Sequence, residues 1–241
     1  MKLILISLLL LTAVAGYSAD IEKIIGKNDF IAVNDDGTNI PLRYRKVLDA
    51  FGIMTTGCTV THLGNGIVLT AGHCFWAPPT LVEHTGCADT EIIWGVRGNK
   101  QGYLKSQCQE VIAAQYTSGL DFAIIKVSPA PDVFIAPDLK RRAIMGDSLT
   151  LFSHPDDLPL HWSQNCGVER NQNPLFPADS LQHQCDTNPG SSGATLLSLV
   201  NLKVVGIHDG GYLDIDGSGM NYGTFVMNSP IYGILKDLGF N

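Results

Sequence analysis

The sequence predicts an all-β protein that ends in one helix. Short segments rich in Val, Ile, Leu and Thr alternate with turns rich in Gly, Asn, Asp and Pro along most of the chain, a rhythm typical of sandwiches and barrels. The 25 glycines suit a fold with many tight turns and bulges. The strand-like segments are GCTVTHL, GIVLTA, EIIWGV, DFAIIKV, DSLTLFS, ATLLSLV, KVVGIHD and GTFVMN.

The first twenty residues, MKLILISLLLLTAVAGYSAD, have the composition of a secretory signal peptide. One lysine precedes an apolar run that small residues follow, and this run is too short to span a bilayer. We expect a signal peptide over 1–19 cleaved near 15–19, a possible short propeptide over 20–23, and a mature domain over 24–241. The mature protein is then secreted, either outside the cell or into the periplasm.

Two segments have helical spacing instead of alternation, RYRKVLDAFGI at 43–53 and SPIYGILKDLG at 229–239. In the second segment Asn228 or Ser229 can cap a helix, and Pro230 suits its first turn. We therefore expect a C-terminal helix at about 229–239.

A Pro-rich stretch, SPAPDVFIAPDLKRRA at 128–143, lacks alternation and is typical of a linker between two halves. The chain is long enough for one large all-β unit or for two small domains that share an interface.

The composition argues against nucleic acid or a membrane as a partner. The net charge is −7, only 16% of the residues are charged, and no block of Lys or Arg stands out. No later segment approaches the length of a membrane span.

All six cysteines lie beyond the signal peptide, and an even number in an exported chain is typical of disulfides. Cys58 and Cys74 bracket two apolar runs joined by HLGNG, which would bring them together across neighbouring strands. Closing a loop of about 15 residues stabilises the folded chain by roughly 3 kcal/mol. Proximity along the chain suggests two further pairs, Cys87 with Cys108 and Cys166 with Cys185.

The stretch VLTAGHCFW raises the question of what His73 does. A zinc site with Cys58, His62 and Cys74 would need reduced thiolates, which an exported chain with paired cysteines disfavours. A catalytic base instead needs a carboxylate that orients the imidazole and a hydroxyl that it activates.

Candidates for both groups lie at the ends of strand-like segments. Asp121 in SGLDFAIIKV directly precedes a buried-looking strand, where it can accept the His73 Nδ1–H. In CDTNPGSSGATLL, Gly190 can turn its N–H and that of Ser192 toward one point, and two converging N–H groups form an oxyanion hole. Ser192 then lies at the focus of the hole and is the predicted nucleophile in preference to Ser191.

The segments TAGHC, DFAII and PGSSGA, in this order, resemble the three signature segments of the trypsin-like (chymotrypsin-fold) serine peptidases. The resemblance implies two six-stranded antiparallel β-barrels, the first at about 24–127 and the second at about 144–228, with the catalytic cleft between them. It also implies a monomeric serine endopeptidase that acts on proteins or peptides through an acyl-enzyme on Ser192.

We expect neither a cofactor nor a metal. The stretch DIDGSG at 214–219 opens like a calcium-binding loop. Its twelfth position is Phe225, where such a loop needs a bidentate glutamate, so a surface turn is the better interpretation.

Two other segments resemble the bacterial glutamyl endopeptidases, or V8-like peptidases. IIGKNDFIAV at 24–33 is similar to their mature start, and VVGIHDGG at 204–211 is similar to their GIH-GG strand. Cleavage after Lys23 would free an amine at the start of the first segment. In that branch the amine, a threonine and a histidine line the primary pocket, and the last two fall here on Thr187 and His208.

A hydroxyl, an imidazolium and an ammonium in one pocket would favour an acidic residue before the scissile bond, the P1 residue. Asp186 opposes this hypothesis, because enzymes selective for Arg and Lys keep their pocket aspartate six residues before the nucleophile. Gly210 and Gly211 are further candidate substrate contacts. Acidic P1 is our first hypothesis, and basic P1 or a non-catalytic protein-binding pseudopeptidase are the alternatives.

Overall fold

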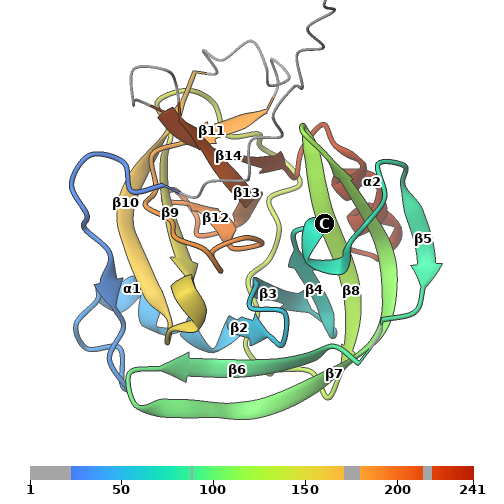
Figure 1. The fold of residues 1–241 in the computed structure, drawn as a ribbon, viewed down its shortest axis with the longest axis horizontal. Helices are drawn as coiled ribbons and strands as arrows, with labels where there is room; N and C mark the ends of the chain where they lie inside the picture. Colours follow the sequence, from blue (N-terminus) through green and yellow to red (C-terminus); the bar gives the residue numbers. More distant parts are fainter. Residues whose placement is uncertain (1–22, 88, 171–179, 214–218) are drawn as a thin grey trace, which may run out of the picture.

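The computed structural model of the chain describes residues 23–87, 89–170, 180–213 and 219–241 (Figure 1). The expected signal peptide and most of the DIDGSG turn lie outside this part of the chain. No helix within it is long and apolar enough to cross a membrane.

The first barrel is a closed ring of six antiparallel strands. They follow the order β7, β6, β2, β3, β4 and β8, and β7 pairs again with β8 to close the ring. A short strand, β5 (Val82–Thr85), extends the sheet at β7. The six strands are β2 (Phe51–Met54), β3 (Thr59–Gly64), β4 (Ile67–Thr70), β6 (Glu91–Arg97), β7 (Lys100–Thr117) and β8 (Leu120–Ser128).

The second barrel repeats this plan. Its strands follow the order β10, β11, β14, β13, β12 and β9, and β9 pairs with β10 to close the ring. The six strands are β9 (Ser148–Ser153), β10 (His161–Glu169), β11 (Leu181–His183), β12 (Thr195–Ser198), β13 (Val204–Leu213) and β14 (Gly219–Phe225). The prediction of two six-stranded antiparallel barrels is therefore confirmed.

The first described strand belongs to the second barrel, whereas the expected first barrel began at residue 24. Strand β1 (Ile31–Ala32) pairs with β10, and the Val33 N–H continues this contact by donating to the Leu160 carbonyl at 2.9 Å. Because Val33 and Leu160 are both buried in the apolar core, this contact of the N-terminal segment with the second barrel removes apolar surface from water.

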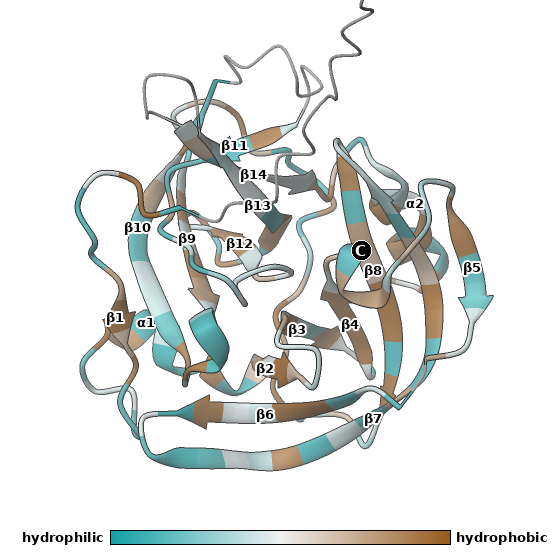
Figure 2. Ribbon diagram, in the orientation of Figure 1, coloured by the Kyte–Doolittle hydropathy of each residue, from teal (hydrophilic) through white to brown (hydrophobic). Residues whose placement is uncertain are grey.

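Apolar side chains fill both barrels and the space between them. Figure 2 shows long apolar stretches along β4, whose four residues are all buried, and along β8, whose residues are mostly buried. Between the barrels, the rings of Phe51 on β2 and Phe152 on β9 stack with their centroids 5.1 Å apart. This packing fixes the two barrels relative to each other.

The C-terminal helix is confirmed as α2 (Pro230–Asp237), with Ser229 at its N-cap position and Pro230 in its first turn. Its buried residues, Ile231 and Leu235, lie one turn apart and pack into the core that both barrels share. The helical spacing at 43–53 gives much less helix than expected.

Residues 43–53 contribute only one short helix and a 3-10 turn. These are α1 (Leu42–Arg45) and η1 (Leu48–Ala50), and β2 begins directly afterwards. The reason is tertiary, because Phe51 is fully buried and pairs with Thr61 on β3, and sheet pairing overrides a local helical preference.

The structure contains the three disulfides that the sequence suggested, Cys58–Cys74, Cys87–Cys108 and Cys166–Cys185. The first ties the beginning of β3 to the 3-10 turn η2 (His73–Phe75). It therefore restrains the turn that carries His73.

Candidate active site

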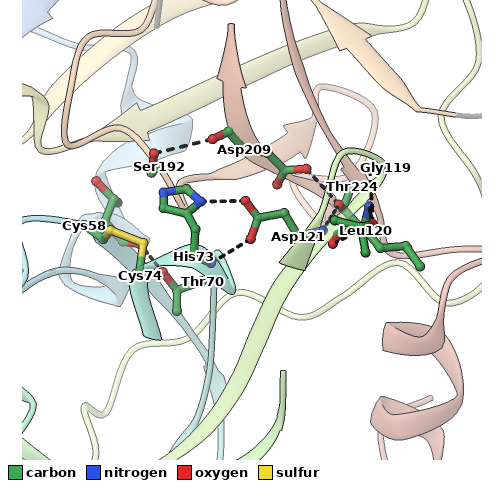
Figure 3. A network of polar contacts seen from close by, with 12 residues as sticks. Cys58, Thr70, His73, Cys74, Gly119, Leu120, Asp121, Ser192, Asp209 and Thr224 are labelled. Carbon is green, nitrogen blue, oxygen red and sulfur yellow. Dashed lines mark hydrogen bonds and ion pairs between the residues drawn. A yellow bond between two sulfur atoms is a disulfide. The ribbon is translucent and has the colours of Figure 1, made fainter. Parts of the chain in front are cut away.

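His73 and Asp121 come from neighbouring parts of the first barrel. His73 begins η2, directly after β4, and Asp121 lies near the start of β8. The Asp121 carboxylate accepts two hydrogen bonds from His73, one from the main-chain N–H at 2.9 Å and one from Nδ1 at 2.5 Å. The carboxylate is buried and thereby fixes the imidazole, which lies between Asp121 and Ser192 in Figure 3.

Ser192 lies on the loop that precedes β12 of the second barrel, between two glycines with positive φ. Gly190 has φ +94°, and a Cβ there would lie 2.5 Å from the His154 carbonyl oxygen. Gly193 has φ +83°, and a Cβ there would lie 2.1 Å from Thr70 Oγ1. Only glycine fits either position without displacing the loop.

The neighbouring Ser191 is enclosed by other protein groups. It is fully buried, and its Oγ lies 3.0 Å from Ser153 Oγ. Ser192 is 8% exposed and lies at the cleft. The structure thus places Ser192, and not Ser191, where a substrate can reach it.

Thr224 joins the two barrels behind the imidazole, and sequence reasoning did not find it. Its hydroxyl accepts the Asp121 N–H at 2.9 Å and donates to the Asp209 carboxylate at 2.8 Å (Figure 3). Thr224 lies on β14 and Asp209 on β13. The second barrel therefore positions the main chain of Asp121.

An open cleft of about 640 Å³ runs past His73, Gly190 and Ser192. Its rim carries two exposed carboxylates, Asp156 and Asp157. An adjoining hollow of about 610 Å³ is lined by His73 together with Trp76 and Tyr116. Ser192 and His73 thus both line this open cleft, and the buried Asp121 carboxylate holds the imidazole.

This geometry agrees with the comparison to known families. A family model described as "Trypsin-like peptidase domain" matches residues 55–207, which include His73, Asp121 and Ser192. The chain belongs to the trypsin-like peptidase family. It is a serine endopeptidase of this family, as the sequence predicted.

Solved structures share the fold of this peptidase. A Glu endopeptidase in complex with MPD has a TM-score of 0.61 at 17% identity and covers 90% of this chain and 99% of its own. An inactive form of Rv3671c from M. tuberculosis has a TM-score of 0.56 at 16% identity, covering 81% and 89%. A serine endoprotease from Yersinia pestis has a TM-score of 0.56 at 14% identity, covering 82% and 68%. A comparison with curated proteins finds no match.

The predicted pocket residues of the peptidase are buried in the second barrel. Thr187 and His208 are both fully buried. His208 Nδ1 lies 3.1 Å from Nε2 of His183, a residue that the sequence analysis did not single out. Burial lowers the pKa of His183 well below its usual value, because the apolar surroundings penalise the charged form.

Asp186 faces the N-terminal segment. Its carboxylate accepts the main-chain N–H groups of Ile25 at 2.8 Å and of Asp29 at 3.0 Å. Burial raises the pKa of Asp186, while these two hydrogen bonds oppose that rise. The carboxylate is thus committed to holding residues 25–29.

The main chain of Lys23 lies against Thr187. Its N–H is 3.1 Å from both Thr187 Oγ1 and Asn221 Oδ1. The resemblance implied an amine at Ile24 beside Thr187, and in the uncut chain the nitrogen found there belongs to Lys23. Asn221, another residue that the sequence analysis missed, lies opposite His183 on β11 and Gly211 on β13.

The residues considered for zinc are engaged in other contacts. Ligand atoms of Cys58, His73 and Cys74 lie within 4.8 Å of one another, but the two sulfurs are bonded to each other. His62 has Nδ1 2.8 Å from the Val133 carbonyl oxygen, and its Nε2 accepts the Gly66 N–H. These residues therefore offer no thiolate to a metal.

Proposed function

We propose that the protein is a secreted serine endopeptidase whose catalytic triad is His73, Asp121 and Ser192, with a preference for acidic P1 residues. The observation that carries this proposal is the paired hydrogen bonding of His73 to the buried Asp121 carboxylate, with the imidazole directed between Asp121 and Ser192. Three disulfides support an oxidising compartment.

In this mechanism His73 takes the Ser192 proton as Oγ attacks the substrate carbonyl carbon. The N–H groups of Gly190 and Ser192 stabilise the oxyanion, and Asp121 stabilises the imidazolium that forms. His73 then protonates the departing amine, and water hydrolyses the acyl-enzyme to release the new carboxylate.

The hydrogen bonds and the burial of the pocket residues support the acidic preference. Asp186, which could have favoured a basic side chain, accepts hydrogen bonds from Ile25 and Asp29. A buried region then holds the hydroxyl of Thr187 and the paired imidazoles of His183 and His208. A carboxylate that entered this region would favour the protonated form of His183.

Gly210 and Gly211 of β13 complete the proposed binding residues. They lie beside the bulge that begins at His208, at a site where the absence of side chains lets a substrate backbone approach.

A peptide-library experiment tests this proposal. We expect the purified protein to cut after Glu or Asp, and Ser192→Ala to abolish every cut. Covalent labelling by a fluorophosphonate should be lost in Ser192→Ala and kept in Ser191→Ala, the matched control. Cuts after Arg or Lys would overturn the acidic preference, and failure of the processed, disulfide-bonded protein to cut or label would indicate a pseudopeptidase.

A further inference from the structure

We propose that Trp76 selects an apolar side chain at the residue directly after the scissile bond, the P1′ residue. This specificity site rests on the proposed endopeptidase activity, but it does not depend on which P1 residue the enzyme prefers.

Trp76 has an exposed side chain close to the catalytic base. The residue is 90% exposed, whereas the other two tryptophans, Trp94 and Trp162, are buried. It ends the 3-10 turn η2, which begins at His73, and its φ of +53° is unfavourable for a residue other than glycine. So exposed a ring contributes little to the core and is accessible to a bound peptide.

The turn that carries Trp76 is firmly held. The Trp76 N–H donates to the His73 carbonyl at 3.0 Å, and the Cys58–Cys74 disulfide ties the same turn to the start of β3. The main chain therefore sets the position of Trp76 relative to the imidazole before any substrate binds.

The adjoining hollow of about 610 Å³ extends from the catalytic base to Trp76. The rings of Trp76 and Tyr116 line it together with His73, and the Tyr116 ring meets the imidazole edge to face, with centroids 5.6 Å apart. Its remaining lining residues are Thr56, Ala77 and the disulfide-bonded Cys58 and Cys74. Among these described residues there is no Asp, Glu, Lys or Arg, so the hollow favours an apolar side chain that leaves water.

The extended backbone of a bound peptide limits which side chain can reach this hollow. Successive side chains of an extended chain point to opposite faces. The proposed P1 pocket residues, Thr187 and His208, belong to the second barrel, whereas Trp76 and Tyr116 belong to the first. A P1 side chain that points to the second barrel directs its two neighbours, P2 and P1′, toward the first.

The open cleft distinguishes P1′ from P2. The proposed backbone contacts Gly210 and Gly211 lie on β13 with the P1 pocket, and neither lines the cleft or the hollow. The chain before the scissile bond therefore follows β13, and the chain after it enters the cleft. Because the hollow shares Thr56, Cys58 and His73 with this cleft, it receives the P1′ side chain.

The proposed chemistry brings the same residue to the hollow. His73 protonates the nitrogen that leaves, and this nitrogen belongs to P1′. The imidazole also lines the hollow, so the P1′ main chain lies at the edge of the hollow when the bond breaks. Contact of its side chain with the indole can then contribute to kcat/KM.

A peptide series with one P1 residue and a varied P1′ residue tests the site. We expect the wild-type protein to cut before Phe with a kcat/KM about 10-fold or more above that before Gly. Trp76→Ala should lower this ratio to less than about threefold, and Trp76→Tyr, which keeps a ring, should retain most of it. Comparing two substrates of one variant cancels any general loss of folded protein, and the wild-type ratio tests the site even if Trp76→Ala does not fold.

The matched control is Phe134→Ala. Phe134 is an aromatic residue that is 55% exposed, and it lines neither the cleft nor the hollow. This variant should keep the full Phe-to-Gly ratio, and a loss as large as that in Trp76→Ala would contradict a specific role of Trp76.

Acyl transfer measures the leaving-group side directly. The amine of an added amino-acid amide attacks the ester carbon of the acyl-enzyme in place of water, His73 takes a proton from that nitrogen, and Ser192 Oγ leaves with this proton. We expect phenylalanine amide to capture about 10-fold more acyl-enzyme than glycine amide, and Trp76→Ala to lose this difference. Equal capture by the wild-type protein would overturn the P1′ assignment, because the amide occupies only the site after the bond.

The outcomes separate this site from the proposed function. Equal cleavage before Phe and Gly, or a ratio that Trp76→Ala leaves unchanged, would overturn the P1′ site and leave the endopeptidase activity standing. Cuts after Arg or Lys that still favour Phe at P1′ would support the site and overturn only the acidic preference. A folded wild-type protein that cuts none of the peptides would overturn both proposals.

Discussion

At the scale of single residues, the Thr224 hydroxyl is the point at which the second barrel holds the main chain of Asp121, the proposed catalytic carboxylate. Thr224→Val removes the acceptor of the Asp121 N–H and the donor to Asp209. We expect kcat to fall about tenfold with KM nearly unchanged, because the loss concerns orientation and not substrate contact. Steady-state kinetics check this, and Thr224→Ser should recover most of the rate. A purely structural role would lower the unfolding midpoint and leave kcat intact.

Gly190 is expected to tolerate no side chain. In Gly190→Ala the new methyl group meets the His154 carbonyl oxygen at 2.5 Å in a backbone with φ +94°, so the loop and its N–H groups must move. We expect kcat to fall by about 100-fold or more, measured on the same peptide. The matched control is Gly233→Ala in α2, where a Cβ meets no atom within 4 Å, and full loss of activity there would contradict the argument.

The residues predicted from the sequence are those that local motifs mark. His73, Asp121 and Ser192 stand in short segments with a recognisable chemistry, and the structure places His73 and Ser192 at one cleft and Asp121 beside His73. Thr224 and Asn221 have no such signal, because only the register of β14 with β11 and β13 places them beside the site. The direction of Asp186 also depended on N–H groups more than 150 residues away in the chain.

At the scale of elements, α2 is attached to the core that both barrels share by its buried side chains. Leu235 is fully buried and packs into that core. Leu235→Ala should lower the free energy of unfolding by about 2–5 kcal/mol, as large-to-small core substitutions do. Urea denaturation measures this, and Leu238→Ala, which alters a side chain that is 36% exposed, should cost much less. Equal losses would show that α2 does not anchor through Leu235.

Element type was predictable wherever the apolar pattern and the turn residues agreed. The tail has a polar cap position, a proline in the first turn and apolar residues one turn apart, and it forms α2. The segment 43–53 has similar spacing but contains Phe51 and Gly52, which pair with Thr61 and Val60 of β3. Long-range pairing of this kind leaves no mark in the segment itself.

At the scale of the whole molecule, buried neutral histidines make stability depend on pH. His154 is fully buried, and loss of hydration lowers its pKa to about 4, while His183 shifts in the same direction. The unfolded chain protonates both near 6.5, so it binds more protons than the folded chain between about 4 and 6.5. Stability must therefore fall as the pH is lowered through this window.

Urea titrations at pH 7 and pH 5 check this expectation. Each histidine contributes a slope of up to about 1.4 kcal/mol per pH unit. His154→Gln removes one titrating group and should flatten the pH dependence, although it lowers stability at every pH. A free energy of unfolding that is constant from pH 7 to pH 5 in the wild-type protein would contradict the assignment of buried neutral histidines.

The two-barrel architecture was predictable because the signature segments indicated it as a unit. The partner of the N-terminal segment was not, since β1 is two residues long and carries no alternation that distinguishes one barrel from the other. Its place follows from the buried contact of Val33 with Leu160.

The enclosure of Lys23 between Thr187 and Asn221 has a practical consequence for recombinant work. Any residue fused ahead of Lys23 is attached at a nitrogen that two fully buried side chains hold. Asn241 follows α2 and is exposed, so an affinity handle belongs at that end.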